Sequence, residues 1–424
     1  LVDDRPYGFV IQNSFNKKRV RAVAFNPRER AGSLAMTDQP YRLLLVTKST
    51  GGIAEYVRWL VKGLDQRKFE ITVVCLSENS ITFADELGQV PNVKAISYEM
   101  NRYKVSLFSD ARLGFRLTKL IRSGQFDLIH AHGSKPGFLV RVAALGTRLP
   151  VIYTPHAFAF HAGRKGVAKS IIIFLESVAA RFTTRFLTVS AGGRDLAIEH
   201  GVGKRTQFVV VNTGIDAEVY RQPVDIPALK AELGIPVDAP VVGSVGRLSE
   251  QKSPLDFVRV AEASLKFKPD ACFVWAGSGP LEAEARKLSA QLGVESSIYW
   301  LGQRSDIPQL LHIFDCFLLT SYWEGFPLVV LEAMAAGVPV VATDISGTRE
   351  SVLHGENGWL APAGDHKALA GFVLGLLNDP KQASAFVQKS YERIDSEFTQ
   401  EKMFRDIQQV YISLLSPTEE NGYR

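Results

Sequence analysis

Residues 324–343 read E-G-F-P-L-V-V-L-E-A-M-A-A-G-V-P-V-V-A-T, and this stretch decides the fold. An apolar run with helical spacing opens near Phe326 and Pro327 and ends at Gly337, since proline favours the first turn of a helix and glycine the position after the last. The run 338–342 that follows is apolar throughout, which is typical of a strand buried on both faces. A helix followed by a buried parallel strand is the repeating unit of α/β folds.

The same alternation of short apolar runs and helical patterns extends along the chain. The strand-like runs are 42–47, 71–76, 93–97, 128–131, 151–154, 186–189 and 208–211 in the first half, and 241–245, 272–276, 298–301, 316–319, 338–342 and 358–360 in the second. Two doubly wound α/β domains are therefore predicted. Turn formers and prolines in residues 212–227 place the boundary between them. Because ligands of open α/β sheets bind at the carboxyl ends of the strands, the site is expected in a cleft between the domains.

Composition is that of an ordinary globular protein, with 46% apolar and 22% charged residues. The three cysteines, Cys75, Cys272 and Cys316, lie far apart in apolar runs, which favours reduced core residues and a cytoplasmic protein. No apolar run approaches the roughly 20 residues needed to span a bilayer. Residues 1–36 contain no secretory apolar segment, and we expect this leader to be disordered or to result from a start codon assigned too early.

Charge is distributed unevenly along the chain. Residues 41–220 carry a net charge of +10, whereas residues 221–424 carry −8. A basic first domain suits anionic partners such as phospholipid surfaces or diphosphate-linked lipids. Nucleic acid is the general alternative, but no nucleic-acid-binding module is recognisable, so we expect no such partner.

Glu324 and Glu332 are separated by seven intervening residues, one before the predicted helix and one within it. Backbone N–H groups at the start of that helix would face a diphosphate or sugar hydroxyls. Glu324 is then placed to accept hydrogen bonds from a sugar, and Glu332, two turns along, to hold a ribose. Carboxylates that only bind hydroxyl groups need no metal.

Arg247 and Lys252 lie in the segment G-R-L-S-E-Q-K, expected as a loop and helix start after the strand 241–245. Two cations at the carboxyl end of a strand neutralise a diphosphate and stabilise the charge that builds up on it when a bond to it breaks. A divalent ion performs that task in many transferases. The sequence contains no D-x-D motif, so we expect cationic side chains in place of a metal, and no cofactor.

The E-x7-E and G-R-L-x-x-x-K patterns resemble those of retaining glycosyltransferases with two Rossmann-like domains facing across a cleft, the GT-B fold, and of family 4 in particular. The resemblance extends from Tyr41 to about Leu415. It implies a first, acceptor domain at 37–215, a second, donor domain at 222–398, and a last helix at about 399–416 that crosses back onto the first domain.

The resemblance also implies roles for single residues. Arg247, Lys252, Glu324 and His156 would be catalytic, with His156 reaching the donor sugar from the first domain. Acceptor contacts would come from His132 and His161. The remaining donor-binding positions would be Gly51, Gly52, Gly302, Gln303, Arg304, Gly325, Phe326, Leu328 and Glu332.

The implied reaction is transfer of a sugar from a nucleotide diphosphate sugar to an acceptor hydroxyl, in polysaccharide or glycolipid assembly, with retention of configuration. A sugar nucleotide epimerase of the same fold and a non-catalytic sugar-nucleotide-binding subunit are the alternatives. Basic residues between Arg102 and Arg122 alternate with leucine and phenylalanine, and Arg164, Lys165 and Lys169 add a second basic patch. These patterns favour peripheral attachment to an anionic membrane, on the inner face of the plasma membrane.

Overall fold

The structure is a computed structural model that describes residues 39–77, 81–101, 106–160 and 166–416. The predicted leader, residues 1–36, lies outside these ranges. The strands are β1 (Tyr41–Lys48), β2 (Phe69–Leu76), β3 (Val93–Tyr98), β4 (Leu128–His132), β5 (Val151–Thr154), β6 (Arg185–Thr188), β7 (Phe208–Val210), β8 (Val241–Val245), β9 (Cys272–Ala276), β10 (Ile298–Gly302), β11 (Cys316–Leu319), β12 (Val340–Thr343) and β13 (Gly358–Ala361).

Helices lie between successive strands nearly everywhere. They are α1 (Gly52–Gly63), α2 (Ile81–Leu87), α3 (Leu107–Ser123), α4 (Ser134–Ala143), α5 (Val167–Ala180), α6 (Ala191–Glu199), α7 (Ile226–Glu232), α8 (Pro254–Leu265), α9 (Glu282–Gln291), α10 (Ile307–Leu311), α11 (Leu328–Ala335), α12 (Ser346–Arg349), α13 (His366–Asn378), α14 (Pro380–Glu397) and α15 (Gln400–Leu415). Short 3₁₀ turns, η1 (Arg205–Gln207), η2 (Ala217–Tyr220) and η3 (Glu295–Ser297), complete the described elements.

The strands form two parallel sheets. The first has the order β3-β2-β1-β4-β5-β6-β7, and the second the order β10-β9-β8-β11-β12-β13. In each sheet the chain runs outwards to one edge and then restarts beside its first strand, which is the doubly wound Rossmann-like topology. The fold class expected from the sequence is therefore confirmed. The residue limits of the two domains stay a prediction.

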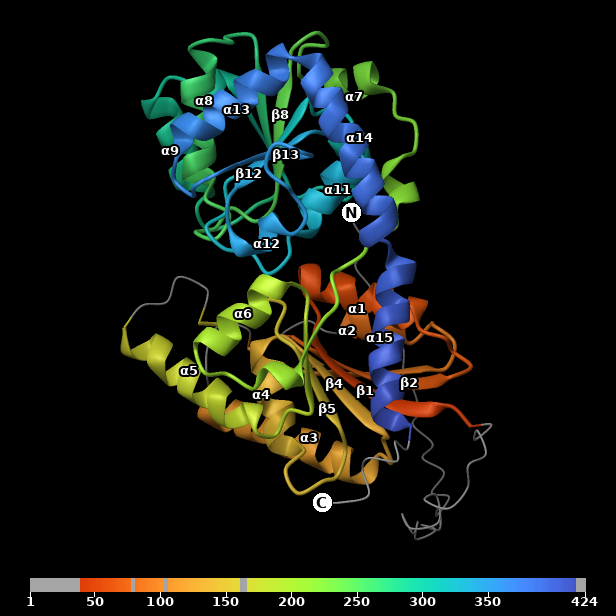
Figure 1. Cartoon of the computed structure of the whole chain (residues 1–424). Helices are drawn as coiled ribbons and strands as arrows, with labels where there is room; N and C mark the ends of the chain where they lie inside the picture. The colour runs from red at the N-terminus through yellow and green to blue at the C-terminus, as the bar shows by residue number, and fades with distance from the viewer. Residues whose placement is uncertain (1–38, 78–80, 102–105, 161–165, 417–424) are drawn as a thin grey trace, which may run out of the picture. The chain divides into compact units, whose positions relative to one another are not determined.

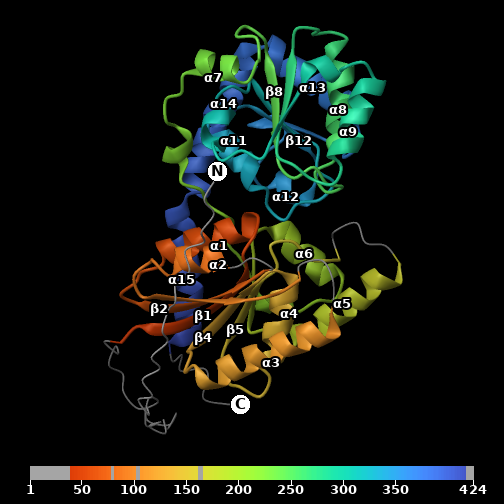
Figure 2. The same cartoon turned by 180° about the vertical axis from the view of Figure 1, so that it is seen from behind.

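Both faces of the first sheet are covered, because successive side chains of β1 point to opposite faces. Leu43 and Leu45 pack toward α1, α2 and α15, whereas Leu44 and Val46 pack toward α3 and α4. Figures 1 and 2 show these helix layers on the two sides of the sheet. The second sheet is enclosed in the same way, with α8, α9 and α13 over one face.

Two segments connect the sheets, and they are hydrogen-bonded to each other. Ile215 N donates to Phe398 O at 2.9 Å, and Gln400 N donates to Ile215 O at 3.2 Å. Position 214 requires glycine, because a Cβ there would lie 2.0 Å from the carbonyl oxygen of Thr399. The two connections thus form one narrow joint.

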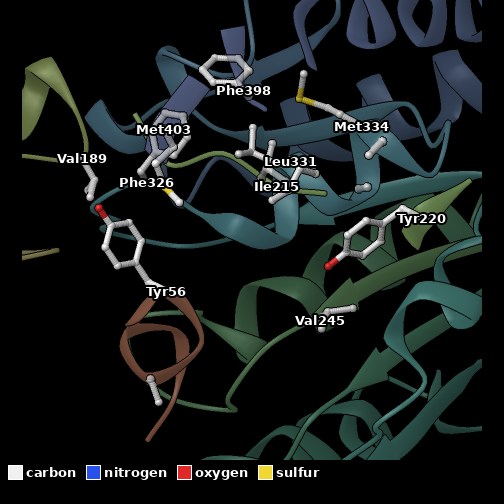
Figure 3. Close-up of a cluster of buried hydrophobic side chains, with 14 of the residues drawn as sticks. Tyr56, Val189, Ile215, Tyr220, Val245, Phe326, Leu331, Met334, Phe398 and Met403 are labelled. Atoms are coloured by element: carbon white, nitrogen blue, oxygen red, sulfur yellow. The ribbon is translucent and has the colours of Figure 1, made fainter. Parts of the chain in front are cut away.

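An apolar cluster at this joint contains side chains from both sheets. Figure 3 shows Ile215, Phe326, Leu331, Phe398 and Met403 grouped together in it. Beyond the joint, α15 returns to the first sheet, where the hydroxyl of Tyr411 lies 2.7 Å from His130 Nδ1.

Strand ends differ from the sequence prediction by a few residues. The strand β12 begins at Val340 instead of residue 338. Pro339 has no N–H to donate to a neighbouring strand, although its carbonyl accepts from Phe317 N at 2.9 Å. Pairing on both sides therefore starts only at Val340.

Candidate active site

The carboxyl ends of β8 and β11 form the switch point of the second sheet, where open α/β sheets bind their ligands. Lys252 follows β8 and Glu324 follows β11, and Lys252 Nζ lies 2.7 Å from Glu324 Oε1. Gln251 Nε2 donates to Glu324 Oε2 at 3.0 Å, and Ser321 Oγ donates to Oε1 at 2.8 Å. The buried Glu324 carboxylate is thus fixed in position by three partners, each from one of these two loops.

Lys252 lies in a loop, because α8 begins only at Pro254. The segment that carries Arg247 and Lys252 was expected as a loop and helix start, and the helix begins two residues after Lys252. The loop is held to the β11 side by Thr320 Oγ1, which donates to the Lys252 carbonyl at 2.9 Å. Arg247 lies in the same loop with an exposed side chain. Both predicted cations therefore come from one loop at the switch point.

Three glycine turns at the ends of β8, β9 and β10 pack against one another. A Cβ on Gly277 would lie 2.0 Å from the carbonyl oxygen of Gly246, and Gly277 N donates to Gly302 O at 2.6 Å. Only residues without a side chain allow this approach. The predicted donor-binding position Gly302 therefore lies beside the loop that carries Lys252.

Arg304 and Gln303 follow in that loop. The Arg304 guanidinium is held by acidic residues, with Nε donating to Asp306 Oδ1 at 2.8 Å and Nη2 3.7 Å from the Glu232 carboxylate. Gln303 is exposed. A nucleotide that contacts the Arg304 guanidinium would therefore share it with the Asp306 carboxylate.

Glu332 lies in the second turn of α11, as predicted. The side chain of Tyr220 donates a hydrogen bond to it, and burial raises the pKa of the Glu332 carboxyl to about 7. The nearby Glu55 carboxylate of α1 raises this pKa further, while the Tyr220 hydrogen bond and Lys252 lower it.

Phe326 and Leu328 lie at the start of α11 but differ in surroundings. The Phe326 ring is buried in the core, 5.5 Å from the ring of Phe398. Its side chain is thus part of the joint, and only its backbone is left for a ligand. Leu328 lies opposite Gly52, where an added Cβ would be 3.8 Å from Leu328 Cδ1. Gly51 caps α1 with φ of 69°, which favours glycine.

His156 follows β5 of the first sheet and has φ of 59°, which is rare for a residue with a side chain. Its carbonyl lies against Gly325, since a Cβ on Gly325 would be 1.6 Å from that oxygen. Burial lowers the pKa of His156 well below its ordinary value, and the neighbouring His132 and Lys48 lower it further. The imidazole is therefore neutral at physiological pH.

Two further histidines with buried side chains, His132 and His130, follow next to His156. His132 Nδ1 is 3.3 Å from His156 Nε2, and His130 Nε2 is 2.8 Å from Thr154 Oγ1. Burial lowers the pKa of His132 to about 3. His132 is fully buried against His156, so its acceptor role stays a prediction, and His161 lies outside the described residues.

A small pocket lies between the first and the second sheet next to His156. His156, Thr188 and Ser190 line it on one side, and Glu324, Gly325 and Ser346 on the other. Its volume is about 20 Å³, which is room for roughly one water molecule. Within the described ranges, no group of three or more His, Cys, Asp or Glu side chains is arranged to hold a metal ion.

Sequence comparison matches nearly the whole described chain. Residues 225–393 match the profile of the family "Glycosyl transferases group 1", and residues 51–214 match that of the "Glycosyl transferase 4-like domain". The chain belongs to the group 1 glycosyltransferases. It is a glycosyltransferase with the GT-B fold.

Similar proteins act on lipid-linked glycans. The UDP-Gal:alpha-D-GlcNAc-diphosphoundecaprenol alpha-1,3-galactosyltransferase of Escherichia coli is 29% identical over 357 residues, 83% of this chain and 91% of that protein. The N,N'-diacetylbacillosaminyl-diphospho-undecaprenol alpha-1,3-N-acetylgalactosaminyltransferase of Campylobacter jejuni is 26% identical, over 76% of this chain and 85% of its own. Anabaena Alr3699/HepE, solved with UDP and glucose, shares the fold with a TM-score of 0.76 and 24% identity, covering 88% of this chain and 100% of its own.

Some residues that shape the site of this glycosyltransferase were not predicted. Tyr220, which bonds Glu332, belongs to the turn η2, and Glu350 lies at the end of the four-residue helix α12. Neither belongs to a recognised motif. Their partners are 112 to 159 residues away along the chain, so only the folded structure brings them into view.

Proposed function

We propose that this glycosyltransferase is a retaining, metal-independent enzyme that moves a sugar from a nucleotide diphosphate sugar to a hydroxyl of a glycan or lipid-linked acceptor. One observation carries the proposal. Glu324, which is paired with Lys252 at the switch point of the second sheet, lines one small pocket together with His156 of the first. A cation for a diphosphate and polar groups for a sugar thus meet at one place.

The bond from the anomeric carbon to the diphosphate breaks while the acceptor oxygen bonds to the same face of that carbon. The acceptor proton passes to the departing diphosphate. Lys252 and Arg247 hold the charge that develops there, and such preorganised charge is usually the largest contribution to rate. Glu324 accepts hydrogen bonds from sugar hydroxyls, and the neutral His156 contacts the sugar from the other side.

The rest of the donor lies along neighbouring elements in this proposal. Glu332 accepts hydrogen bonds from the ribose, and Gly302, Gln303 and Arg304 contact the base. Gly51, Gly52, Gly325 and the backbone at Phe326 and Leu328 approach the diphosphate and sugar, with no cofactor taking part. The printed names of the E. coli and C. jejuni relatives support a diphospho-lipid acceptor.

Lys252→Ala tests the proposed role of the cation. Loss of one group that stabilises the transition state costs about 100- to 1000-fold in kcat. Turnover is measured with UDP-, GDP- and ADP-sugars in EDTA, and Lys266→Ala is the control, since Lys266 is exposed at the carboxyl-terminal cap of α8, where it pairs with Glu262. Unchanged turnover in Lys252→Ala would show that this lysine does not stabilise the leaving group.

Binding of the donor nucleotide is tested separately by thermal stabilisation with UDP, GDP, ADP, CMP and NAD. A ligand at 100 times its Kd adds about 2.7 kcal/mol, which gives a clear shift in Tm. We expect one nucleoside diphosphate to stabilise the protein in EDTA. A shift with NAD alone would contradict the donor site, and binding without turnover would favour a non-catalytic subunit.

Peripheral attachment to an anionic membrane completes the proposal. Helices α3, α4 and α5 lie on one side of the first sheet (Figure 1), and together they form what we call the α3–α5 surface. Phe108 and Phe115 of α3 are 84% and 72% exposed, and Val167 and Phe174 of α5 are 76% and 67% exposed. Exposed apolar side chains at such density mark an interaction site.

The charges of the α3–α5 surface suit anionic lipid. The acids of the three helices, Asp110 and Glu176, are paired with Lys135 and Arg141. The exposed bases are Arg112, Arg116, Lys119 and Arg122. The predicted apolar face of α3 is divided, since Leu113 and Leu117 are buried in the core. Arg102, Lys104, Arg164 and Lys165 lie outside the described residues.

Co-sedimentation with phosphatidylglycerol vesicles tests this attachment. Ile171→Ser with Phe174→Ser removes apolar area from the α3–α5 surface, and we expect binding to fall several-fold. Phe267→Ser is the matched control, because Phe267 is 78% exposed but lies after α8 in the second half. Equal binding by both proteins would place the membrane contact elsewhere.

Within the described part of the chain, none of the helices combines the length and apolar character that crossing a bilayer requires.

A further inference from the structure

The amino-terminal end of α6 is occupied by a carboxylate from the other half of the molecule. Glu350 accepts hydrogen bonds from Ala191 N and Gly192 N, both at 2.9 Å, one with each carboxylate oxygen. Asn212 Nδ2 donates to the same carboxylate at 3.2 Å. The first N–H groups of a helix lack partners within the helix and favour a negative charge, so this is a strong set of contacts.

Glu350 is itself held by the second half of the chain. It follows α12, and its carbonyl oxygen accepts a hydrogen bond from Arg393 Nη2 of α14 at 2.8 Å. Its carboxylate is therefore presented by α12 and α14 to the first sheet. Figures 1 and 2 both show α12 facing α6.

The four-residue helix α12 packs directly on the loop that carries Glu324. A Cβ on Gly347 would be 2.7 Å from the carbonyl oxygen of Glu324, and a Cβ on Gly192 would be 2.6 Å from Ser346 Cβ. Glycines thus allow α6, α12 and the Glu324 loop to stack without intervening side chains. A displacement of α12 relative to α6 would be transmitted to Glu324.

The pocket between His156 and Glu324 lies at the same seam as the Glu350 contacts, with residues of both halves of the molecule in its lining. Separation of the two sheets at this seam would break the Glu350 contacts, and re-forming them would bring the Glu324 loop back to His156. Enzymes that close over their substrates use motions of this kind.

We propose that Glu350 is a positioning residue for the transfer, which closes the seam by binding the start of α6 and thereby sets Glu324 opposite His156. The inference rests on the proposed function, because Glu324 and His156 are its donor-sugar contacts. A carboxylate suits the task, since it offers two acceptor oxygens and a full negative charge to three N–H donors. Glutamine offers one acceptor oxygen and no charge.

Closure is measured first, without ligand and without turnover. The three cysteines are buried, so donor and acceptor dyes can be attached to Glu199→Cys on α6 and Lys367→Cys on α13, both at exposed positions. Single-molecule energy transfer then reports the ratio of closed to open molecules. We expect Glu350→Gln to lower that ratio by about tenfold, the size of effect expected from losing hydrogen bonds to a charge.

Turnover provides the second readout. With the donor sugar identified, Glu350→Gln should lower kcat/KM by about the same factor as the closed ratio, with little change in Tm. Asn212→Ala, which removes one of the three donors from the first sheet, should give a smaller change in the same direction. Glu356→Gln is the matched control, an exposed carboxylate six residues along the chain.

An unchanged closed ratio in Glu350→Gln would overturn the proposal, and so would a change no larger than that of Glu356→Gln. If Glu350→Gln fails to fold, the closed ratio of Asn212→Ala decides in its place. A changed ratio in a protein that transfers no sugar would refute the proposed function but leave Glu350 as the closing residue, so the two failures can be told apart.

Discussion

At the scale of single residues, Glu332 is a carboxyl group whose pKa burial in the fold raises. The folded protein holds its proton up to about pH 7, whereas the unfolded chain loses it near the ordinary pKa of 4.5. Raising the pH above 4.5 therefore lowers the free energy of unfolding until the folded carboxyl also ionises. Glu332→Gln removes this dependence, so its Tm should fall less than that of the wild type between about pH 5 and about pH 8.

The control for this prediction is Tyr220→Phe. The Tyr220 hydroxyl stabilises the charged carboxylate, so its removal should raise the pKa of Glu332 and strengthen the pH dependence of Tm. Parallel Tm profiles for the wild type and Glu332→Gln would show that Glu332 does not titrate in this range.

Motifs predicted most residues that the structure brings to the switch point, because Lys252 and Glu324 each lie in a loop that follows a strand of recognisable pattern. Glu350 could not be predicted, since its role depends on a contact with residues 158 and 159 positions away. Phe326 shows the opposite case. It belongs to the motif, yet its side chain packs in the core, because an apolar ring gains more from burial beside Phe398 than from contact with a polar donor.

At the scale of elements, the strands were predictable because each is short, apolar on both faces and bounded by turn formers. The helix α12 was not, since four residues carry no helical period. In the helix α3, Leu113, Leu117 and Ile121 pack inwards, whereas Phe108 and Phe115 stay exposed. Periodicity identifies helical faces but does not distinguish a face that meets the sheet from one that stays exposed.

The joining of α4 to α5 depends on a buried ion pair. Arg141 Nη2 lies 2.8 Å from Glu176 Oε2, and both side chains are almost fully buried against Tyr153. Arg141→Met leaves the Glu176 charge without its partner, so we expect a loss of about 3–5 kcal/mol in unfolding free energy, measured by urea titration.

Replacing both partners should recover most of this loss. The double variant Arg141→Met with Glu176→Leu contains no buried charge, and such replacements are often neutral or stabilising. Arg67→Met is the control, because Arg67 is exposed and pairs with Asp65 at the surface, where no measurable change is expected. A double variant as unstable as the single one would point to packing instead of charge.

At the scale of the whole molecule, the apolar cluster at the joint links the two sheets. Because the cluster contains core side chains from both, neither sheet can unfold without exposing apolar area of the other. We expect a single transition in scanning calorimetry, with the calorimetric enthalpy equal to the van't Hoff enthalpy. Two separate peaks would mean that the sheets unfold independently.

The path of α15 has a consequence for recombining this enzyme with its relatives. A chimera made by a single crossover near residue 215 would combine the first sheet with a foreign helix in place of 400–415, and His130 would lose its Tyr411 partner. Exchange of donor specificity between relatives therefore calls for two crossovers, at the hydrogen-bonded Ile215 and Thr399 segments. Under the proposed function, the segment to graft for a change of sugar preference is internal to the chain, and the carboxyl-terminal helix belongs with the amino-terminal half.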